Sequence, residues 1–233
     1  MISEVNFAKN YSSFWTEYTP WVKDYVHSLN SGLIEHLYTS LEEKDDPKYR
    51  SINNVTAFTL FKNTVYLNNN DIDKAFVESV RILKNYPRTN IDTYQLTDPL
   101  NYRTIKTISD RLRSRYKNDN IIFYPQFNGC GILDNCQGDL FINQTLIEIK
   151  AGDRNITVQD LRQLLIYSAL NWLSGTCEIS YVELFNPRTG HLWNASILEF
   201  VSSISDLSME DLFEQIGKYL SDLSEDVIYG NSI

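Results

Sequence analysis

Apolar and polar positions alternate with a period of two over residues 145–150. This alternation predicts a β-strand in which Glu148 and Lys150 share one face. Ile147 and Ile149 occupy the other face and point into a core. The strand therefore places a carboxylate and an ammonium side by side at the surface of a sheet.

A second β-like run precedes this strand over residues 140–142, and the polar pair Asn143 and Gln144 separates the two runs. Short apolar runs joined by a polar pair are typical of a β-hairpin. Asp139 opens the first run, so the hairpin brings its carboxylate beside that of Glu148. The alternative is a solvated strand edge, with charges that serve solubility, followed by an ordinary amphipathic helix.

A helical period follows over residues 158–173, with apolar side chains on one stripe. Thr157 and Asp160 resemble a capping box with Asp in the place of Glu, and Gly175 lies just past the end of the pattern. Polar side chains spaced by four residues form a second face: Gln159, Gln163 and Tyr167. That face can look toward the two carboxylates.

The rest of the pattern predicts helices in the first half and strands in the second. Helices are expected around residues 11–22 with a break at Pro20, over 31–44, over 72–85 after a cap at Asp71, and over 101–117. Residues 43–48 form a charged linker, and 54–67 fit a helix or a strand. Strands are expected over 121–124, 178–185 and 191–200, with a turn at 186–190 and a last helix over 209–223. We expect a mainly helical lobe at 1–100 and a core domain at 101–233.

Two neighbouring carboxylates are the minimum that a protein contributes to a Mg²⁺ site, because this ion keeps several waters. The backbone carbonyl of Ile149 can add a third ligand. A lysine beside such a site suits phosphodiester hydrolysis, since it orients the attacking water and offsets the charge that develops on phosphorus.

The chain resembles the PD-(D/E)XK nuclease superfamily in three successive elements. They are Asp139 at a first strand, Glu148-Ile149-Lys150 on a second strand, and Gln163-x-x-x-Tyr167 on a helix. The Q-x-x-x-Y element is similar to that of its RecB-type branch. The resemblance covers residues 121–193, and Gly138 stands in the place of the name-giving proline.

The resemblance implies an α/β fold with a restriction-endonuclease-like αβββαβ core, a mixed sheet flanked by helices. It also implies Mg²⁺ or Mn²⁺ held by Asp139 and Glu148, with Lys150 as the catalytic lysine. Gln163 and Tyr167 would be the pair that orients substrate or water.

Gly32 and His36 form a G-x-x-x-H pattern that resembles the first core helix of many RecB-type nucleases, where the histidine assists metal binding. Such a short pattern also arises by chance. Two interpretations of His36 therefore stay open, a metal-assisting residue and a histidine on a helix surface.

With 233 residues, 42% of them hydrophobic and 13% aromatic, the chain can bury a sizeable core, and this composition argues against disorder. No apolar run approaches the roughly 20 residues that cross a bilayer, and residues 1–6 do not begin a secretory signal, so we expect a cytoplasmic protein without a membrane partner. Three cysteines without a C-x-x-C pair and three histidines argue against a disulfide framework and a zinc site. Reduced, partly buried structural thiols are expected instead.

The net charge of −9 and the pI near 4.8 are unfavourable for an enzyme that binds nucleic acid. One basic run opposes this charge, and its candidate phosphate-binding residues are Arg111, Arg113, Arg115 and Lys117. A solvated helix face is the alternative for this run. Either these residues concentrate the positive charge that binds nucleic acid, or a protein partner or a second copy of the chain supplies the contacts that hold it.

Two functions follow. The first is a metal-dependent nuclease that hydrolyses phosphodiester bonds of nucleic acid, DNA rather than RNA, and the resemblance associates such enzymes with phage defence and mobile elements. The second is a catalytically silent interaction subunit with a nuclease-like fold, which fits the acidic charge and N-terminal aromatic residues that look exposed. The pattern leaves open endonuclease or exonuclease action and the strand preference.

Overall fold

The computed structural model describes residues 1–42, 46–84, 101–117 and 120–229. The chain divides into two compact units. The first, the sheet unit, comprises residues 1–37, 120–186 and 191–233, and the second, the helical unit, comprises residues 38–119 and 187–190. The expected division at residue 100 differs from this grouping, because the first 37 residues belong with the sheet and residues 101–119 belong with the other helices.

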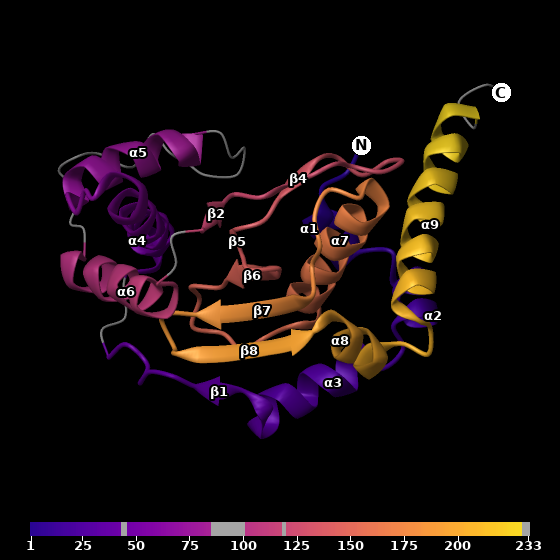
Figure 1. Ribbon diagram of the computed structural model, residues 1–233, viewed down its shortest axis with the longest axis horizontal. Coiled ribbons are helices and arrows are strands. Elements are labelled where there is room, and N and C mark those ends of the chain that lie inside the picture. Colours follow the sequence, from indigo (N-terminus) through magenta and orange to yellow (C-terminus); the bar gives the residue numbers. More distant parts are fainter. Residues whose placement is uncertain (43–45, 85–100, 118–119, 230–233) are drawn as a thin grey trace. The chain divides into compact units, whose positions relative to one another are not determined.

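A mixed six-stranded sheet flanked by helices makes the chain an α/β protein, as expected (Figure 1). The strand order is β1 (Glu35–His36), β8 (His191–Ser196), β7 (Tyr181–Asn186), β6 (Thr145–Ile149), β5 (Leu140–Ile142) and β2 (Ile122–Phe123). The pair β6 and β7 is parallel, and the other pairs are antiparallel. A separate small hairpin joins β3 (Gln126–Phe127) to β4 (Cys136–Gln137).

The predicted hairpin is confirmed, since β5 and β6 pair in an antiparallel register with Ile142 opposite Thr145. Asn143 and Gln144 form its two-residue turn with φ of 47° and 62°. Two successive positive φ angles match the right-handed twist of the flanking strands, and asparagine tolerates them better than most residues.

The helix α7 (Val158–Ser174) makes the crossover between the parallel strands β6 and β7. As predicted, the Asp160 carboxylate accepts the Thr157 N–H at 2.9 Å, and Gly175 ends the helix at φ 61°. The start and the end of this helix could both be predicted from the sequence, because capping depends on local geometry.

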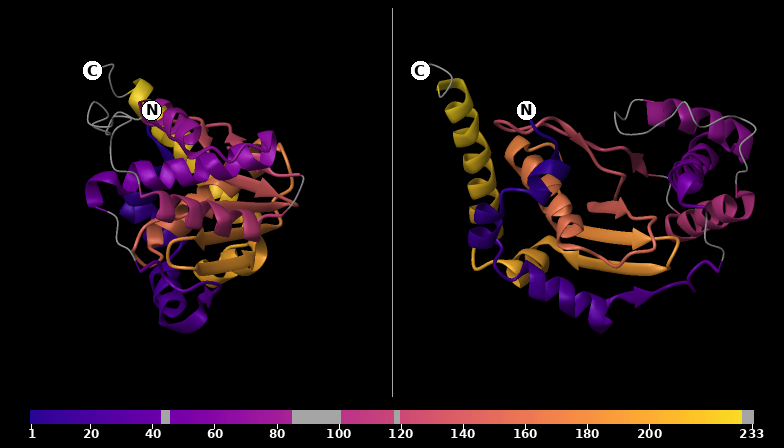
Figure 2. Two further views of the ribbon diagram at one scale, coloured as in Figure 1. Left: turned by 90° about the vertical axis from the view of Figure 1, so that its left-hand side faces the viewer. Right: turned by 180° about the vertical axis from the view of Figure 1, so that it is seen from behind.

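Helices from both ends of the chain pack against α7 (Figure 2). They are α1 (Glu4–Lys9), α3 (Val22–Ser28) and α9 (Met209–Tyr229). Two shorter helices of the same unit are α2 (Ser12–Tyr18) and α8 (Ile197–Ile204). Because it is covered on several sides, α7 is the central helix of the core, with Leu161 and Leu165 fully buried.

Most of the N-terminal aromatic residues belong to this core and do not form an exposed patch, although Trp21 is exposed. Phe7 and Trp15 are 0% exposed, and the Trp15 indole donates to the Phe7 carbonyl at 2.8 Å. Phe14 stacks on Tyr219 of α9 with a centroid distance of 4.4 Å. The interpretation of these aromatics as an exposed surface is therefore wrong for Phe7, Phe14 and Trp15 and holds for Trp21 alone among the aromatic residues of this segment.

The helical unit consists, in its described part, of α4 (Pro47–Leu67), α5 (Ile72–Lys84), α6 (Tyr102–Arg115) and the turn at residues 187–190. The segment left open between helix and strand is helical within α4, which Asp46 caps through the Lys48 N–H. Asp71 caps α5 as predicted.

Two predicted elements are wrong. The helix expected over 31–44 is not formed in its described part, residues 31–42: the π-helical turn η1 (Leu29–Leu33) contains Gly32 at φ 150°, and the chain then extends into β1. The strand expected over 191–200 ends at Ser196, where Ser196 and Glu199 cap α8. Predictions that fall on residues 43–45 and 85–87 lie outside the described residues. Among the described residues, no helix is both long and apolar enough to cross a membrane.

Candidate functional site

The hairpin places Asp139 and Glu148 opposite each other. Leu140 pairs with Ile147, so the antiparallel register sets the preceding residue, Asp139, against Glu148. The Asp139 carboxylate accepts the backbone N–H of Ile149 at 2.7 Å. This hydrogen bond holds one carboxylate against the backbone of the strand that carries the other.

Burial determines the electrostatics of this pair. Glu148 is 6% exposed and lies on β6, which has a neighbour on each side. Burial, followed by the charge of Asp139, raises the pKa of Glu148 to about 8. Burial likewise raises the pKa of Asp139, against the opposing effects of the Ile149 N–H and Lys150. The alternative of a solvated strand edge is wrong for Glu148, because β6 is central and the side chain is buried.

One oxygen of the pair has no partner. Glu148 Oε1 accepts from the Lys150 ammonium at 2.8 Å, whereas the buried Glu148 Oε2 has no hydrogen-bond partner among the described residues. A buried carboxylate oxygen normally has a partner, because its desolvation is costly. The free oxygen, its neighbour Asp139 and the hard-ligand character of both groups fit a divalent cation.

Lys150 lies at the end of β6, where its backbone N–H continues the ladder to Phe185 at 2.9 Å. Its ammonium donates to Glu148 and, at 2.8 Å, to Gln163 Oε1. Burial alone would lower the lysine pKa, but the charges of Glu148 and Asp160 outweigh it and raise the pKa. Lys150 is therefore a positioned cation beside the carboxylates.

Gln163 connects Lys150 to Tyr167, so the predicted helix face does look toward the carboxylates. The Gln163 amide donates to the Tyr167 hydroxyl at 2.7 Å, and this hydroxyl donates to the Gln137 carbonyl at 3.1 Å. Tyr167 is 1% exposed, and burial together with Glu148 and Glu4 raises its pKa. The phenol is thus a neutral anchor for Gln163. Gln159, on the same spacing, is exposed.

The sequence pattern missed Glu4, which approaches the same cluster from α1. One of its carboxylate oxygens lies 3.4 Å from the Tyr167 hydroxyl oxygen. Burial, then Glu4 and Glu148, raise the pKa of the Cys136 thiol to about 12, so this thiol is neutral. Glu4 lies well over a hundred residues before the motif in the chain, and no local pattern connects the two.

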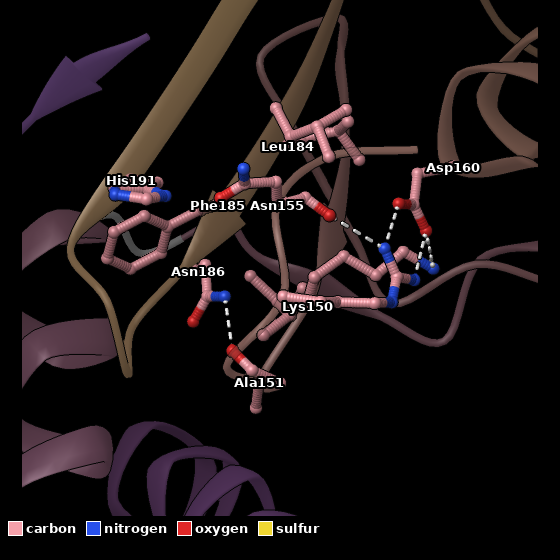
Figure 3. Close-up of a pocket in the computed structure, with 12 residues that line it drawn as sticks. Lys150, Ala151, Asn155, Asp160, Leu184, Phe185, Asn186 and His191 are labelled. Carbon is pink, nitrogen blue, oxygen red and sulfur yellow. Dashed lines mark hydrogen bonds and ion pairs between the residues drawn. The ribbon is translucent and has the colours of Figure 1, made fainter. Parts of the chain in front are cut away.

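Asp160 was predicted as a helix cap, and the structure gives it a second role. Arg154 donates to its two oxygens at 2.6 and 2.8 Å, and the Lys150 ammonium lies 3.5 Å from it (Figure 3). Burial would raise the pKa of Asp160, but Arg154, Lys150 and Thr157 lower it overall. An ionised, buried Asp160 therefore contacts both Lys150 and Arg154.

Gly138 has a physical reason to stand where the pattern that the chain resembles has a proline. Its N–H donates to the Pro125 carbonyl at 2.9 Å, and proline has no such donor. A Cβ at this position would lie 3.3 Å from the Phe127 ring and 3.3 Å from the Pro125 ring, which is tighter than usual packing. Glycine therefore lets the hairpin begin close to the β3–β4 pair.

His36 does not reach this site. It lies on β1, not on a helix, and β8 and β7 separate β1 from β6. Its ring instead meets the His191 ring at a centroid distance of 4.6 Å. Both earlier interpretations of His36, as a metal-assisting residue and as a helix-surface residue, are wrong.

The basic run lies in the helical unit, with Arg111, Arg113 and Arg115 on α6 and Lys117 just after it. Arg111 donates to the carbonyls of Pro187 and Thr39, both at 2.8 Å, and its guanidinium lies over the Tyr38 ring. Arg113 pairs with Asp110 at 2.9 Å, Arg115 is half-buried and Lys117 is exposed. Arg111 thus has a structural role that the sequence pattern did not indicate.

In the part of the chain that the structure describes, no three or more His, Cys, Asp or Glu side chains gather as a metal-binding group. The Asp139 and Glu148 pair falls below that number, and a Mg²⁺ site of this kind relies on waters and backbone oxygen for its remaining ligands. Comparison of the chain with protein-family models, curated proteins and solved structures finds no match.

Proposed function

We propose that this chain is a divalent-metal-dependent nuclease of the PD-(D/E)XK superfamily, RecB-type branch, which hydrolyses phosphodiester bonds of DNA. One observation carries the proposal. Two carboxylates, the buried Glu148 and the half-buried Asp139, lie opposite each other with the Glu148 Oε2 atom unpartnered among the described residues, next to a lysine held by Gln163. Two like charges this close together, one of them buried, are costly, and a cation offsets that cost.

Mg²⁺ or Mn²⁺ would bind to Asp139 and Glu148, and the Ile149 carbonyl would be the third protein ligand. The donor set is all oxygen, which suits these hard cations. When bound, the cation supplies a Lewis acid for the phosphate and lowers the pKa of a bound water.

The chain's own residues position the reactants. Lys150 offsets the charge that develops on the phosphate oxygens and orients the attacking water. Gln163 and Asp160 fix the lysine head from two sides, at 2.8 and 3.5 Å. Tyr167 fixes Gln163 in turn. A lysine held by several partners loses little conformational freedom when substrate arrives, and such preorganisation favours the transition state.

The arrangement of elements supports the same proposal. A helix before β2, the antiparallel strands β2, β5 and β6, the crossover helix α7 and the parallel strand β7 follow the αβββαβ order of that superfamily. A fold of this kind hosts many functions, so the site and not the order of elements carries the assignment.

The direct test is cleavage of labelled linear, circular and single-stranded DNA by purified protein in Mg²⁺, in Mn²⁺ and in EDTA. We expect cleavage in either metal and none in EDTA. Comparison of circular with linear substrate separates endonuclease from exonuclease action. RNA of the same sequence tests the expected preference for DNA.

The second function is the silent interaction subunit. It is favoured by the contacts that already occupy the arginines of the basic run. Arg111 and Arg113 already have partners within the helical unit, in a chain with a net charge of −9. An enzyme that has few cations available to bind a polyanion needs a partner that supplies further positive charge. Absence of cleavage in every metal and on every substrate, together with tight binding to a second protein, would support this function.

A further inference from the structure

A cavity of about 120 Å³ adjoins Lys150 at the carboxyl ends of the parallel strands β6 and β7 (Figure 3). We name it the base cavity, and the residues that matter for its chemistry are Lys150, Asn155, Ile156, Leu184, Asn186 and His191. All of them belong to the sheet unit. Because Lys150 lines the cavity and also bonds to Glu148, the cavity and the carboxylate pair share this side chain.

The segment 150–156 that forms one wall is held at several points. The Asn186 amide donates to the Gly152 carbonyl at 2.7 Å, and the Asn30 amide donates to the Ile156 carbonyl at 2.9 Å. Arg154 is held by Asp160. A wall fixed in this way belongs to a pre-formed cavity, as ligand sites usually are.

The walls suit a neutral ring better than a phosphate. Leu184 and Ile156 are apolar, whereas Asn155, Asn186 and His191 supply polar groups. The two cations that line the cavity, Lys150 and Arg154, both lie against Asp160, which also lines it. Their charge is thus partly balanced, and a polar rim over an apolar surface is the chemistry that recognises a nucleobase.

The volume admits one base and excludes a base pair. A base stacked and paired in duplex DNA reaches such a cavity only after unpairing, which costs a few kcal/mol, whereas a base in a single strand is already free. The position beside Lys150 places the cavity next to the phosphate that the proposed site would cleave.

We propose that the base cavity receives the base of the nucleotide next to the scissile phosphate, and that the enzyme therefore acts on unpaired nucleotides, in single strands or frayed ends. This inference rests on the proposed nuclease function and adds its substrate class. The base is held by its edge and face, and the phosphate lies at the carboxylates and Lys150.

The first experiment measures binding and needs no cleavage. A deoxynucleoside 5′-monophosphate and deoxyribose 5-phosphate, which lacks the base, are titrated separately into the protein in Ca²⁺. We expect the nucleotide to bind at least about tenfold more tightly, since contact with one base contributes that much in single-strand binding. Asn155→Ala should reduce this preference several-fold at unchanged melting temperature. The matched control is Asn194→Ala, which removes the same amide from an exposed position of β8 outside the cavity.

The outcomes separate the two proposals. Equal affinity for both ligands, in a protein that cleaves DNA, would overturn the base cavity and leave the nuclease function standing. Base-dependent binding without cleavage in any metal would support the cavity and overturn the nuclease. Absence of both would overturn both.

The second experiment compares cleavage rates on one labelled sequence, single-stranded, fully paired, or paired with a short unpaired end. We expect the single strand and the unpaired end to be cleaved at least about tenfold faster than the duplex. Equal rates on all three substrates would contradict the requirement for an unpaired base.

Discussion

The Lys150 ammonium donates a 2.8 Å hydrogen bond to Glu148 Oε1, on the carboxylate whose other oxygen is unpartnered among the described residues. The lysine thus neutralises one side of the carboxylate and leaves the other side for a cation. Asp160 and Gln163 hold the same ammonium, so it does not depend on Glu148 alone for its position. Under the proposed function, the carboxylates would be metal ligands and Lys150 a separate positioned cation, and this division of roles is testable.

Lys150→Ala is expected to lower the turnover rate by about a hundredfold or more while metal affinity changes little. The lysine acts on charge that develops in the transition state and is not a ligand. Single-turnover cleavage at saturating Mg²⁺ measures the rate, and metal titration of the cleavage activity measures the affinity. A defect that excess metal restores would contradict this role.

Asp139→Asn and Glu148→Gln should each abolish cleavage with the fold retained. Each variant removes a charged metal ligand and keeps the size of the side chain, so packing on β5 and β6 is preserved. Cleavage assays over a Mg²⁺ and Mn²⁺ series, with circular dichroism for the fold, measure both effects. Near wild-type cleavage by either variant at saturating metal would show that the metal assignment is wrong.

Glu148 should make the metal-free protein less stable as pH rises. Its pKa is raised from 4.5 to about 8 in the folded state, so the native protein holds a proton that the unfolded chain releases. The stabilisation from this proton is complete below pH 4.5 and is lost as pH rises through about 8. We expect a loss of up to a few kcal/mol over this window, and Asp139, whose pKa is also raised, acts in the same direction.

Urea unfolding in EDTA at pH 5 and pH 8.5 measures this effect in wild type and in Glu148→Gln. The glutamine variant cannot titrate, so its free energy of unfolding should fall less over the same interval. Comparison of the two proteins cancels the other groups that titrate there, such as His191, whose lowered pKa acts in the opposite direction. Identical pH slopes in both proteins would contradict the raised pKa of Glu148.

The parts of this structure that follow from local rules were predictable. The hairpin turn at Asn143 and Gln144, the cap at Asp160 and the stop at Gly175 each depend on a few neighbouring residues. The strand pattern that includes Glu148 and Lys150 was predictable for the same reason. The burial of Glu148 was not predictable, because exposure of a strand face depends on whether a helix covers it.

Contacts between distant segments were not predictable. Glu4 reaches Tyr167 because α1 packs on α7, and Arg111 binds the carbonyls of a turn that lies 76 positions away. The predicted helix over 31–44 failed because β8 offers an open edge, and pairing with that edge outweighs a local helical period. The sequence pattern brings together Asp139, Glu148, Lys150, Gln163 and Tyr167 and misses the residues that contact them from elsewhere in the chain.

Asp160→Asn is expected to destabilise the protein by about 2 kcal/mol and to slow cleavage. The variant weakens the helix cap and leaves Arg154 and Lys150 without a charged partner on that side. Arg154→Ala should cost less, since this side chain is 55% exposed and exposed ion pairs contribute little. Asp206→Asn, at an exposed position outside the site, is the matched control and should change neither quantity. Thermal unfolding measures stability, and single-turnover kinetics measure the cleavage rate. If Asp160→Asn changed neither quantity, this carboxylate would have no role in stability or cleavage.

The last prediction concerns the basic run, because the proposed nuclease function, in a chain with a net charge of −9, requires cations that are available to phosphate. Arg113 and Lys117 are exposed, and the pair of Arg113 with Asp110 is an exposed ion pair that exchanges readily for a phosphate contact. Each lost phosphate contact lowers the slope of log affinity against log salt by about 0.9 on duplex DNA and about 0.7 on single strands. Arg113→Gln with Lys117→Gln should therefore weaken binding and flatten the slope by up to about 2 units, without a change in sequence preference.

Arg111→Gln should behave differently because its guanidinium is committed to the carbonyls of Pro187 and Thr39. We expect it to lower the melting temperature and leave the salt slope unchanged. Lys9→Gln with Lys23→Gln removes two exposed charges from the sheet unit and controls for net charge alone. Fluorescence anisotropy across a salt series in Ca²⁺ measures all three proteins. If the Arg113 and Lys117 double variant keeps the wild-type slope, α6 is a solvated face, and the cations that hold substrate must come from other residues or from a second chain.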